Sequence, residues 1–465
     1  MHKLAQSLLQ WEWVLLLLLL FPVALLPWGY TTAFLAVVPL LWLLRKAITG
    51  RFLTPTPYDL AVLALVLAIG LSLTVTFDWA TSGPKIAGIL LGIAFLYATA
   101  GSGRHGGSLW PIVGVVLLAG VLMAIVGFIG SQWLPPFAFL NGARAWLPFA
   151  GGIPGAVGGV VNPNELAGVL SWVLPLALAC VLTGMQRPAR TRLVILATLL
   201  PVMAFVGFLL VATSSRGGML AAGLGLLLVI AFFVQSRWRL VLGIGVLVGL
   251  GALVAYTASR VDQNIVGDAV GMSGRLEIWS RALLAIGDFP LTGVGVNGFR
   301  RVIDVLYPLY SIPADIDLGH AHNQMLQAAL DLGLPGLTAY LAIWAISARL
   351  LWSSYRHLRQ RHAANHPYYG LVAGLAGSLL AGWVFGIFDA IALGARPGFI
   401  WWLLLGLTAG VHYAVVYSGE SLRRHRRRAA AAQSVAPANL AVLPDGRDSR
   451  GSRPQSLPAP SQPTD

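Results

Sequence analysis

Long uninterrupted apolar runs restrict what this chain can fold into. Many of them extend over about 18 to 25 residues, which is the length an α-helix needs to cross roughly 30 Å of hydrocarbon. Only 10% of the residues are charged, whereas soluble globular domains have roughly 25%. Transmembrane β-barrels would instead show alternating segments of ~10 residues. The sequence therefore predicts an all-α, polytopic membrane protein.

Turn residues and charges divide the apolar runs into twelve predicted membrane spans. They are 13–28, 31–44, 58–76, 84–100, 110–130, 161–183, 192–212, 218–235, 239–257, 335–352, 369–388 and 397–417. The chain is then organised in four parts. Residues 1–257 hold nine spans, 258–334 form one long loop that contains short helices, and 335–417 hold three further spans. The basic tail, 418–465, is rich in Ala, Pro, Ser and Gly and is predicted to be disordered.

Lysine and arginine are distributed unevenly between the two sides of this topology. Most of the 31 basic residues fall on the side that holds both termini, and six consecutive tail positions, 423–428, are all basic or histidine. Cytoplasmic loops are enriched in such residues, so we expect both termini in the cytoplasm and the long loop on the outer side. The tail cluster suits anionic lipid headgroups, and we expect membrane lipids rather than nucleic acid as its partner.

The long loop concentrates the ionisable side chains of an otherwise apolar chain. Ser273 precedes an apolar pattern that predicts an amphipathic helix over 274–287, in which Glu277 and Arg281 lie four residues apart and pair. Two shorter helices are predicted over 299–307 and 321–332. The function is therefore sought in this loop and in the span ends beside it.

Two arginines stand out for their positions. Arg216, in a Ser-Arg-Gly turn at the outer end of a span, is a functional candidate because an arginine at membrane depth is costly without a partner. The alternative is an interfacial arginine that contacts headgroups. Arg275 falls in the first turn of the amphipathic helix, where its planar guanidinium matches phosphate geometry. A surface salt bridge is the alternative for Arg275.

Two histidines, His320 and His322, lie close together near the end of the loop. Imidazole titrates near neutral pH and can take a proton from a hydroxyl, so a general base is one use, and Asn323 could order the acceptor or the ring. A structural histidine remains the alternative. Zinc is disfavoured because no HExxH motif or cysteine partner is present. Asp315 and Asp317 are a weaker candidate for a cation, and we expect no metal and no cofactor.

These motifs occur in an order that resembles the O-antigen ligase and polymerase superfamily. The resemblance covers roughly residues 160–410 and depends on Asn162-Pro163-Asn164-Glu165, Ser215-Arg216-Gly217, Gly274-Arg275 with Trp279, Gly293-x-Gly295-x-Asn297, and His322-Asn323 with Gly333 and Gly336. Each motif is weak alone, and the order makes the match specific. The family's second arginine is often followed by a leucine four positions on, where this chain has Trp279, so Arg281 stays open as an alternative to Arg275.

The resemblance implies a bacterial inner-membrane glycosyltransferase that uses undecaprenyl-diphosphate-linked glycans at the periplasmic face. It implies Arg216, Arg275 and His322 as the catalytic residues. Further candidates for binding diphosphate or substrate are Arg281, His320, Asn323, Arg300, Arg301, Asn162 and Asn164. We expect a metal-independent, inverting ligase that transfers the glycan to lipid A–core oligosaccharide. An O-antigen polymerase, a protein O-oligosaccharyltransferase and, from another class, a lipid-linked sugar transporter remain alternatives.

Overall fold

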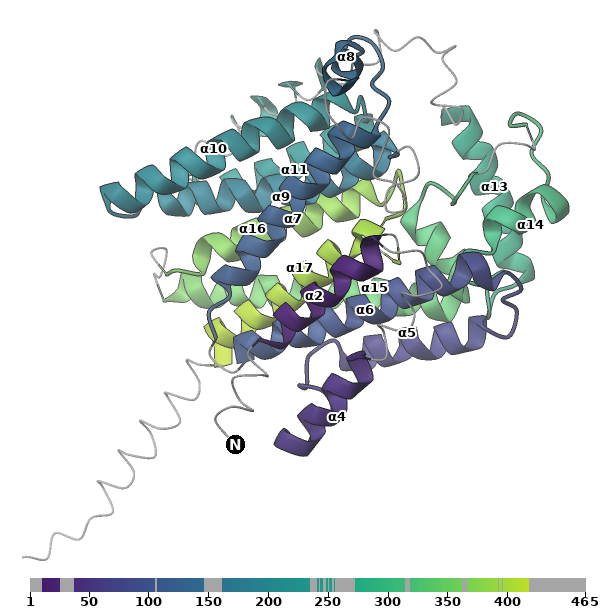
Figure 1. Cartoon of the computed structure of the whole chain (residues 1–465), viewed down its shortest axis with the longest axis horizontal. Coiled ribbons are helices and arrows are strands. Elements are labelled where there is room, and N and C mark those ends of the chain that lie inside the picture. Colours follow the sequence, from purple (N-terminus) through teal and green to yellow (C-terminus); the bar gives the residue numbers. More distant parts are fainter. Residues whose placement is uncertain are drawn as a thin grey trace, which may run out of the picture. The chain divides into compact units, whose positions relative to one another are not determined.

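The computed structural model describes residues 11–25, 37–104, 107–145, 161–234, scattered positions between 241 and 255, 272–313, 318–361, 366–391, 393, 394 and 396–417. These residues form helices joined by turns, with no strand among them, which confirms the predicted all-α class (Figure 1). The tail from 418, most of the predicted span 239–257, and Asp315 and Asp317 lie outside the described residues.

The described part of the chain contains fourteen α-helices. They are α2 (Glu12–Leu25), α4 (Val37–Thr49), α5 (Asp59–Ser72), α6 (Trp79–Arg104), α7 (Trp110–Gly130), α8 (Phe139–Ala145), α9 (Pro163–Gly184), α10 (Ala189–Ala212), α11 (Arg216–Phe233), α13 (Met272–Asp288), α14 (Phe299–Leu306), α15 (Gln324–Gln360), α16 (Tyr369–Phe385) and α17 (Phe399–His412). Short 3-10 and π turns, η1 (Arg396–Gly398) and η2 (Tyr413–Tyr417), flank α17.

Seven described helices are long and apolar enough to cross a membrane. They are α6, α7, α9, α10, α11, α15 and α17 continued through η2, and α5 and α16 are shorter apolar helices. All nine fall on predicted spans. The described parts of α2 and α4 have 14 and 13 residues, and 26–36 between them lie outside the described residues. The predicted count of twelve spans is therefore not confirmed.

Helices α9, α11 and α16 pack side by side, α6 packs on α17, and α5 packs on α15 (Figure 1). Small residues permit the closest approaches. A Cβ on Gly225 of α11 would lie 2.6 Å from the carbonyl oxygen of Gly377 in α16, and the reverse distance is the same. Membrane helices associate through such small-residue contacts because lipid supplies no hydrophobic driving force between them.

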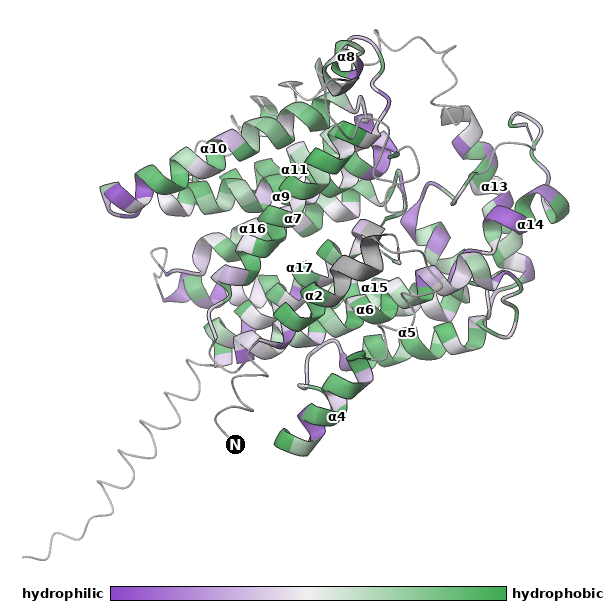
Figure 2. Ribbon diagram, viewed as in Figure 1, coloured by the Kyte–Doolittle hydropathy of each residue, from purple (hydrophilic) through white to green (hydrophobic). Residues whose placement is uncertain are grey.

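Aromatic side chains fill the centre of the helix bundle. Tyr340 and Trp344 of α15 pack against Trp401 of α17, and Trp401 packs on Trp402. All four are buried. Figure 2 shows apolar residues along the helices and hydrophilic ones gathered at helix ends and over α13 and α14. The polar chemistry of the chain is thus confined to one part of the described fold and to the helix termini.

Helices α13 and α14 correspond to the helices predicted over 274–287 and 299–307. The helix predicted over 321–332 and the span predicted from 335 are the two parts of α15, which begins at Gln324 and is kinked at Gly333. The sequence reading separated them because Gly333 and Pro335 break helical periodicity. The backbone does leave helical geometry there, with φ 67° and ψ −176° at Gly333, and resumes at once.

Glycine is required where the loop between α13 and α14 meets this break. The N–H of Val294 donates to the Leu330 carbonyl at 2.8 Å, and that of Leu334 donates to the Pro290 carbonyl at 2.7 Å. Gly293 has φ 63°, and a Cβ on it would lie 2.2 Å from the Leu330 oxygen. Only glycine adopts this left-handed conformation with so little space. The contact fixes the α13–α14 segment against the start of α15.

Candidate active site

Two histidines and a buried aspartate meet just before α15. The His320 Nε2 lies 3.3 Å from Asp389 Oδ1, and the His322 Nδ1 lies 3.5 Å from the same oxygen. Asp389, which follows α16, is 2% exposed. The imidazole rings are 4.5 Å apart between centroids, arranged edge to face. The fold therefore joins the histidines of the long loop to a carboxylate 67 positions further along the chain than His322.

The backbone around His322 is held in an uncommon conformation. His322 has φ 49°, a left-handed value that few non-glycine residues adopt. The carbonyl of Ala321 accepts a hydrogen bond from Trp279 Nε1 at 3.0 Å, and the Ala321 N–H donates to Gln327 Oε1 at 2.8 Å. A strained residue that the surroundings hold in place is typical of functional sites. Trp279 thereby links α13 to the position of the histidine.

Asn323 and Gln324 attach the segment that carries Asp389. The Asn323 Oδ1 accepts from the N–H groups of Met325 and Leu326, which caps α15, and its Nδ2 donates to the Ile387 carbonyl at 3.1 Å. The Gln324 N–H donates to the Gly386 carbonyl at 2.7 Å. Asn323, predicted to order the acceptor or the imidazole, is thus engaged in fixing Asp389 beside the histidines.

Burial sets the protonation of His320. It lowers the pKa of His320 to about 4, against the opposing attraction of Asp389, and the charges of Lys85 and Arg275 lower it further. The ring is therefore neutral at pH 7. Its Nδ1 accepts from the His322 N–H at 3.2 Å, so its proton is assigned to Nε2, the atom that faces Asp389.

Asp389 is the anion of this cluster. Burial alone raises the pKa of its carboxyl, but His320, His322 and the N–H of Ala390 outweigh burial and hold that pKa below its usual value. Neither Asp389 Oδ2 nor His322 Nδ1 has a hydrogen-bond partner among the described residues. The 3.5 Å separation from Oδ1 is long for a hydrogen bond, and catalytic hydrogen bonds often tighten only when substrate is bound. A proton on Nδ1 would leave Nε2 of His322 free as a base.

Of the two predicted arginines, Arg275 acts on this cluster, and Arg216 begins a helix whose first turn contacts Phe388. Arg275, in the first turn of α13, is half-buried, and its Nε is buried without a partner in the described chain. Its charge acts on His320. Arg216 is the exposed first residue of α11, which Ser215 caps by accepting from the Gly218 N–H. A Cβ on Gly217 would lie 3.0 Å from the Phe388 side chain. The backbone at the start of α11 is therefore close to the residue that precedes Asp389.

Two other predicted arginines have structural partners. Arg281 Nε donates to the Pro308 carbonyl at 3.1 Å, and its guanidinium lies 4.0 Å from Glu277, as expected from their spacing. Arg301 Nε lies 3.2 Å from Asp78 Oδ2. These contacts tie α13 and α14 to neighbouring segments. They favour Arg275 over Arg281 as the residue that faces the histidines.

The remaining candidates, Arg300, Asn162 and Asn164, lie at the starts of α14 and α9. Arg300 is a half-buried residue of α14. Asn162 caps α9 by accepting from the Asn164 N–H at 2.8 Å. A Cβ on Gly168, further along α9, would meet Phe385 and Ile391. The first part of α9 therefore packs against residues on either side of Asp389 in the sequence.

Asp389 and Lys85 were missed from the sequence. Lys85 Nζ, in α6, lies 2.5 Å from Asp331 Oδ2, and Asp331 Oδ1 accepts from Gln327 Nε2 and from the Asn297 N–H. An available signal was that each is a lone ionisable residue at the end of an apolar span, where such residues are costly and commonly functional. Gln327 connects this ion pair to the backbone of the histidine loop.

The cluster also has the composition of a cation site. The nearest ligand atoms of His320, His322 and Asp389 all lie within 4.8 Å of one another, and two imidazoles with a carboxylate suit several transition metals. This aspartate is absent from the local sequence around the histidines, which is why a zinc site was disfavoured there. Lys85 and Arg275, whose charges reach His320, oppose binding of a divalent cation.

Residues 201–341 match the family model for O-antigen ligase. The match contains Arg216, Arg275 and His322. It confirms the resemblance to the O-antigen ligase family. A relative described as an O-antigen ligase, from Pseudomonas aeruginosa, is 27% identical over 173 residues, which are 37% of this chain and 39% of the relative. The chain thus spans about two fifths of the relative's length. Asp389 lies beyond the residues matched by the family model.

Proposed function

We propose that this protein is an O-antigen ligase that transfers a glycan from undecaprenyl diphosphate to a sugar hydroxyl of lipid A–core oligosaccharide. The observation that carries the proposal is His322, paired with the buried Asp389 and placed beside Arg275 within the family-matched region. The active site faces the periplasm of a bacterial inner membrane, since the basic residues predict both termini in the cytoplasm.

In this reaction His322 Nε2 takes the proton of the acceptor hydroxyl. The hydroxyl oxygen forms a bond to the anomeric carbon as the bond from that carbon to the diphosphate oxygen breaks. Undecaprenyl diphosphate leaves with the electron pair, and the anomeric configuration inverts. Asp389 stabilises the imidazolium that forms, as a buried carboxylate does for a catalytic histidine in other enzymes.

The arginines act on the leaving group. Negative charge on the diphosphate grows as the anomeric bond breaks, so a guanidinium aimed at it favours the transition state over the ground state. Arg275 offers a half-buried fork with an unpartnered Nε, and Arg216 offers an exposed one at the start of α11, where free N–H groups also attract anions. The mechanism needs no metal in this form.

Transfer measured in vitro with purified donor and acceptor tests the proposal. His322→Ala should lose most turnover while keeping the wild-type melting temperature, and His366→Ala, in the loop before α16, should retain activity. Wild-type turnover in folded His322→Ala would refute the role of the base. Full activity in excess chelator supports the metal-free scheme, whereas a complete and reversible loss would assign the His320, His322 and Asp389 cluster to a metal.

The choice between ligase and polymerase depends on the acceptor. A deletion strain of a ligase carries no polymer on its lipopolysaccharide and accumulates long lipid-linked chains. A polymerase defect would instead leave single repeat units attached to the core. The single long loop near the end of the chain and the His-Asn pattern favour the ligase, and this phenotype decides between the two.

A further inference from the structure

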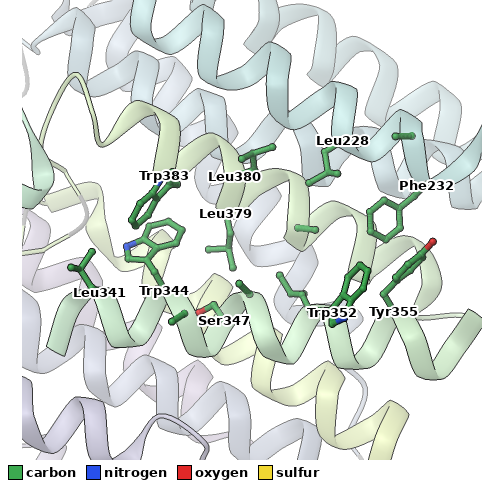
Figure 3. A pocket seen from close by; sticks show the side chains of 15 residues that line it. Leu228, Phe232, Leu341, Trp344, Ser347, Trp352, Tyr355, Leu379, Leu380 and Trp383 are labelled. Carbon is green, nitrogen blue, oxygen red and sulfur yellow. The ribbon is translucent and has the colours of Figure 1, made fainter. Parts of the chain in front are cut away.

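An apolar groove of about 780 Å³ runs along α15 between α11 and α16 (Figure 3). Its walls are formed by Leu341, Trp352 and Tyr355 of α15, Phe232 of α11 and Leu380 of α16. Trp352 is 61% exposed at its edge. The lining on α15 extends from Leu341 to Tyr355, a rise of about 21 Å. One leaflet of a bilayer is roughly 15 Å deep, so the groove has room for a lipid hydrocarbon chain.

The two ends of this groove differ. At one end the indole rings of Trp344 and Trp383 pack edge to face, 5.4 Å apart, as Figure 3 also shows. At the other end Trp352 also lines two smaller hollows of about 350 and 310 Å³, and Tyr355 lines the second of them. The apolar groove therefore continues directly into a polar site at its second end.

The polar site is strongly basic. Arg349, Ser353, Arg356 and Gln360 repeat every three or four positions and so share one face of α15, and Arg359 lies beside them. The sequence contains no aspartate or glutamate from 332 to 388, so neither α15 beyond its break nor α16 supplies a carboxylate. All of these residues belong to α15, and clusters of arginine at the end of a membrane helix attract anionic lipid headgroups.

The basic site is separate from the candidate active site. Arg356 lies 23 residues beyond the helix break at Gly333, or roughly 35 Å along α15, which is about one bilayer thickness. A diphosphate held near His322 cannot also contact Arg349 and Arg356. The two phosphate-binding chemistries are therefore at opposite ends of the same helix.

We propose that this groove binds one anionic phospholipid, with an acyl chain along α15 and its phosphate on Arg349 and Arg356. The charge of the site selects the headgroup, because an arginine pair without carboxylates favours phosphatidylglycerol over zwitterionic phosphatidylcholine. Trp352 and Tyr355 lie where chain and headgroup meet, the depth at which aromatic residues gather in membrane proteins. The lipid would fill the space between α11, α15 and α16.

Native mass spectrometry of the full-length, delipidated protein in detergent tests this site. The probes are phosphatidylglycerol and phosphatidylcholine with the same acyl chains. We expect one retained phosphatidylglycerol and at least tenfold weaker binding of phosphatidylcholine. The double substitution Arg349→Gln, Arg356→Gln should weaken phosphatidylglycerol about 25-fold, or about fivefold for each arginine.

Two further variants make the test specific. Ala348→Trp fills the exposed groove while leaving both arginines, and should abolish retention of the lipid. The double substitution Arg190→Gln, Arg192→Gln removes two exposed arginines at the start of α10 and should leave binding unchanged. Melting temperatures confirm that each variant is folded.

Three results would overturn the proposal. Equal binding of phosphatidylglycerol and phosphatidylcholine would show that the arginines do not select the headgroup. If the α10 control variant lost as much phosphatidylglycerol binding, the binding would depend on the overall positive charge of the protein and not on this site. Binding of a polyprenyl phosphate that is blocked by Ala348→Trp but indifferent to the Arg349 and Arg356 pair would assign the groove to the chain of the glycan donor.

Discussion

Asp389→Asn should separate catalysis from folding in the candidate active site. The substitution keeps the shape of the side chain and removes its charge. In the proposed reaction His322 becomes an imidazolium 3.5 Å from Asp389 Oδ1. A charge pair at that distance is worth about 4 to 5 kcal/mol at an effective dielectric constant of ~20. Its loss from the transition state corresponds to roughly 10³-fold in kcat.

The stability of the fold should respond far less than turnover does. Asp389 is buried, and its Oδ2 has no hydrogen-bond partner among the described residues. The pKa of its carboxyl is nevertheless held below its usual value, so the ionised form is favoured in the folded state and Asp389→Asn should lower the melting temperature slightly. A residue that only holds the fold together would lose stability and activity together.

The assay is single-turnover transfer with saturating donor and acceptor, accompanied by thermal unfolding of the same preparation. Asp304→Asn, an exposed carboxylate on α14, is the matched control and should retain both properties. The reasoning is refuted if Asp389→Asn keeps more than about one third of wild-type turnover. It is also refuted if turnover falls only in proportion to the folded fraction.

Three further predictions concern the charges around the histidines. Arg275→Lys and Arg216→Lys should each lose most transfer activity because an ammonium keeps the charge but not the bidentate fork; normal turnover in both would make them general electrostatic contributors. Lys85→Met should destabilise the protein by about 3 to 5 kcal/mol, measured by denaturant unfolding, because it leaves buried Asp331 without its partner; an unchanged midpoint would contradict this. The folded-state pKa of His320 is lowered from 6.5 to about 4, so the unfolded chain binds the extra proton first and stability falls as pH drops from 6.5 to 4, by about 3 kcal/mol. His320→Gln should flatten that part of the melting-temperature profile, and a profile identical to wild type would be the contrary result.

The sequence predicted the elements of this fold better than their boundaries. Apolar length identified nine described helices because hydrocarbon thickness fixes how long a spanning helix must be. The same reading separated the two parts of α15, since Gly333 and Pro335 are ordinarily helix breakers. The structure has a kink at this point: Gly333 leaves helical geometry, and the Leu334 N–H donates to the Pro290 carbonyl of the loop after α13.

The candidate site was predicted in part for a different reason. His322, Arg275 and Arg216 belong to motifs that a sequence displays locally. Asp389 does not, because it reaches the histidines only after Asn323 and Gln324 bind the turn that follows α16. Contacts that depend on how helices pack leave no local pattern, whereas an ionisable residue at a span end leaves a weak one.

The charges of the site explain why its second histidine should stay neutral. Lys85 and Asp331 compensate each other, which leaves Asp389 to balance one of the two arginines when no donor is bound. A protonated His320 would add a cation whose ring centroid lies 4.5 Å from that of His322 and would oppose the proton that the base must accept. Burial prevents this by lowering the pKa of His320, while the same ring still donates to Asp389. His320 can therefore orient the carboxylate without competing with His322 for the proton, and the positive charge that remains, on Arg275 and Arg216, is available for the diphosphate.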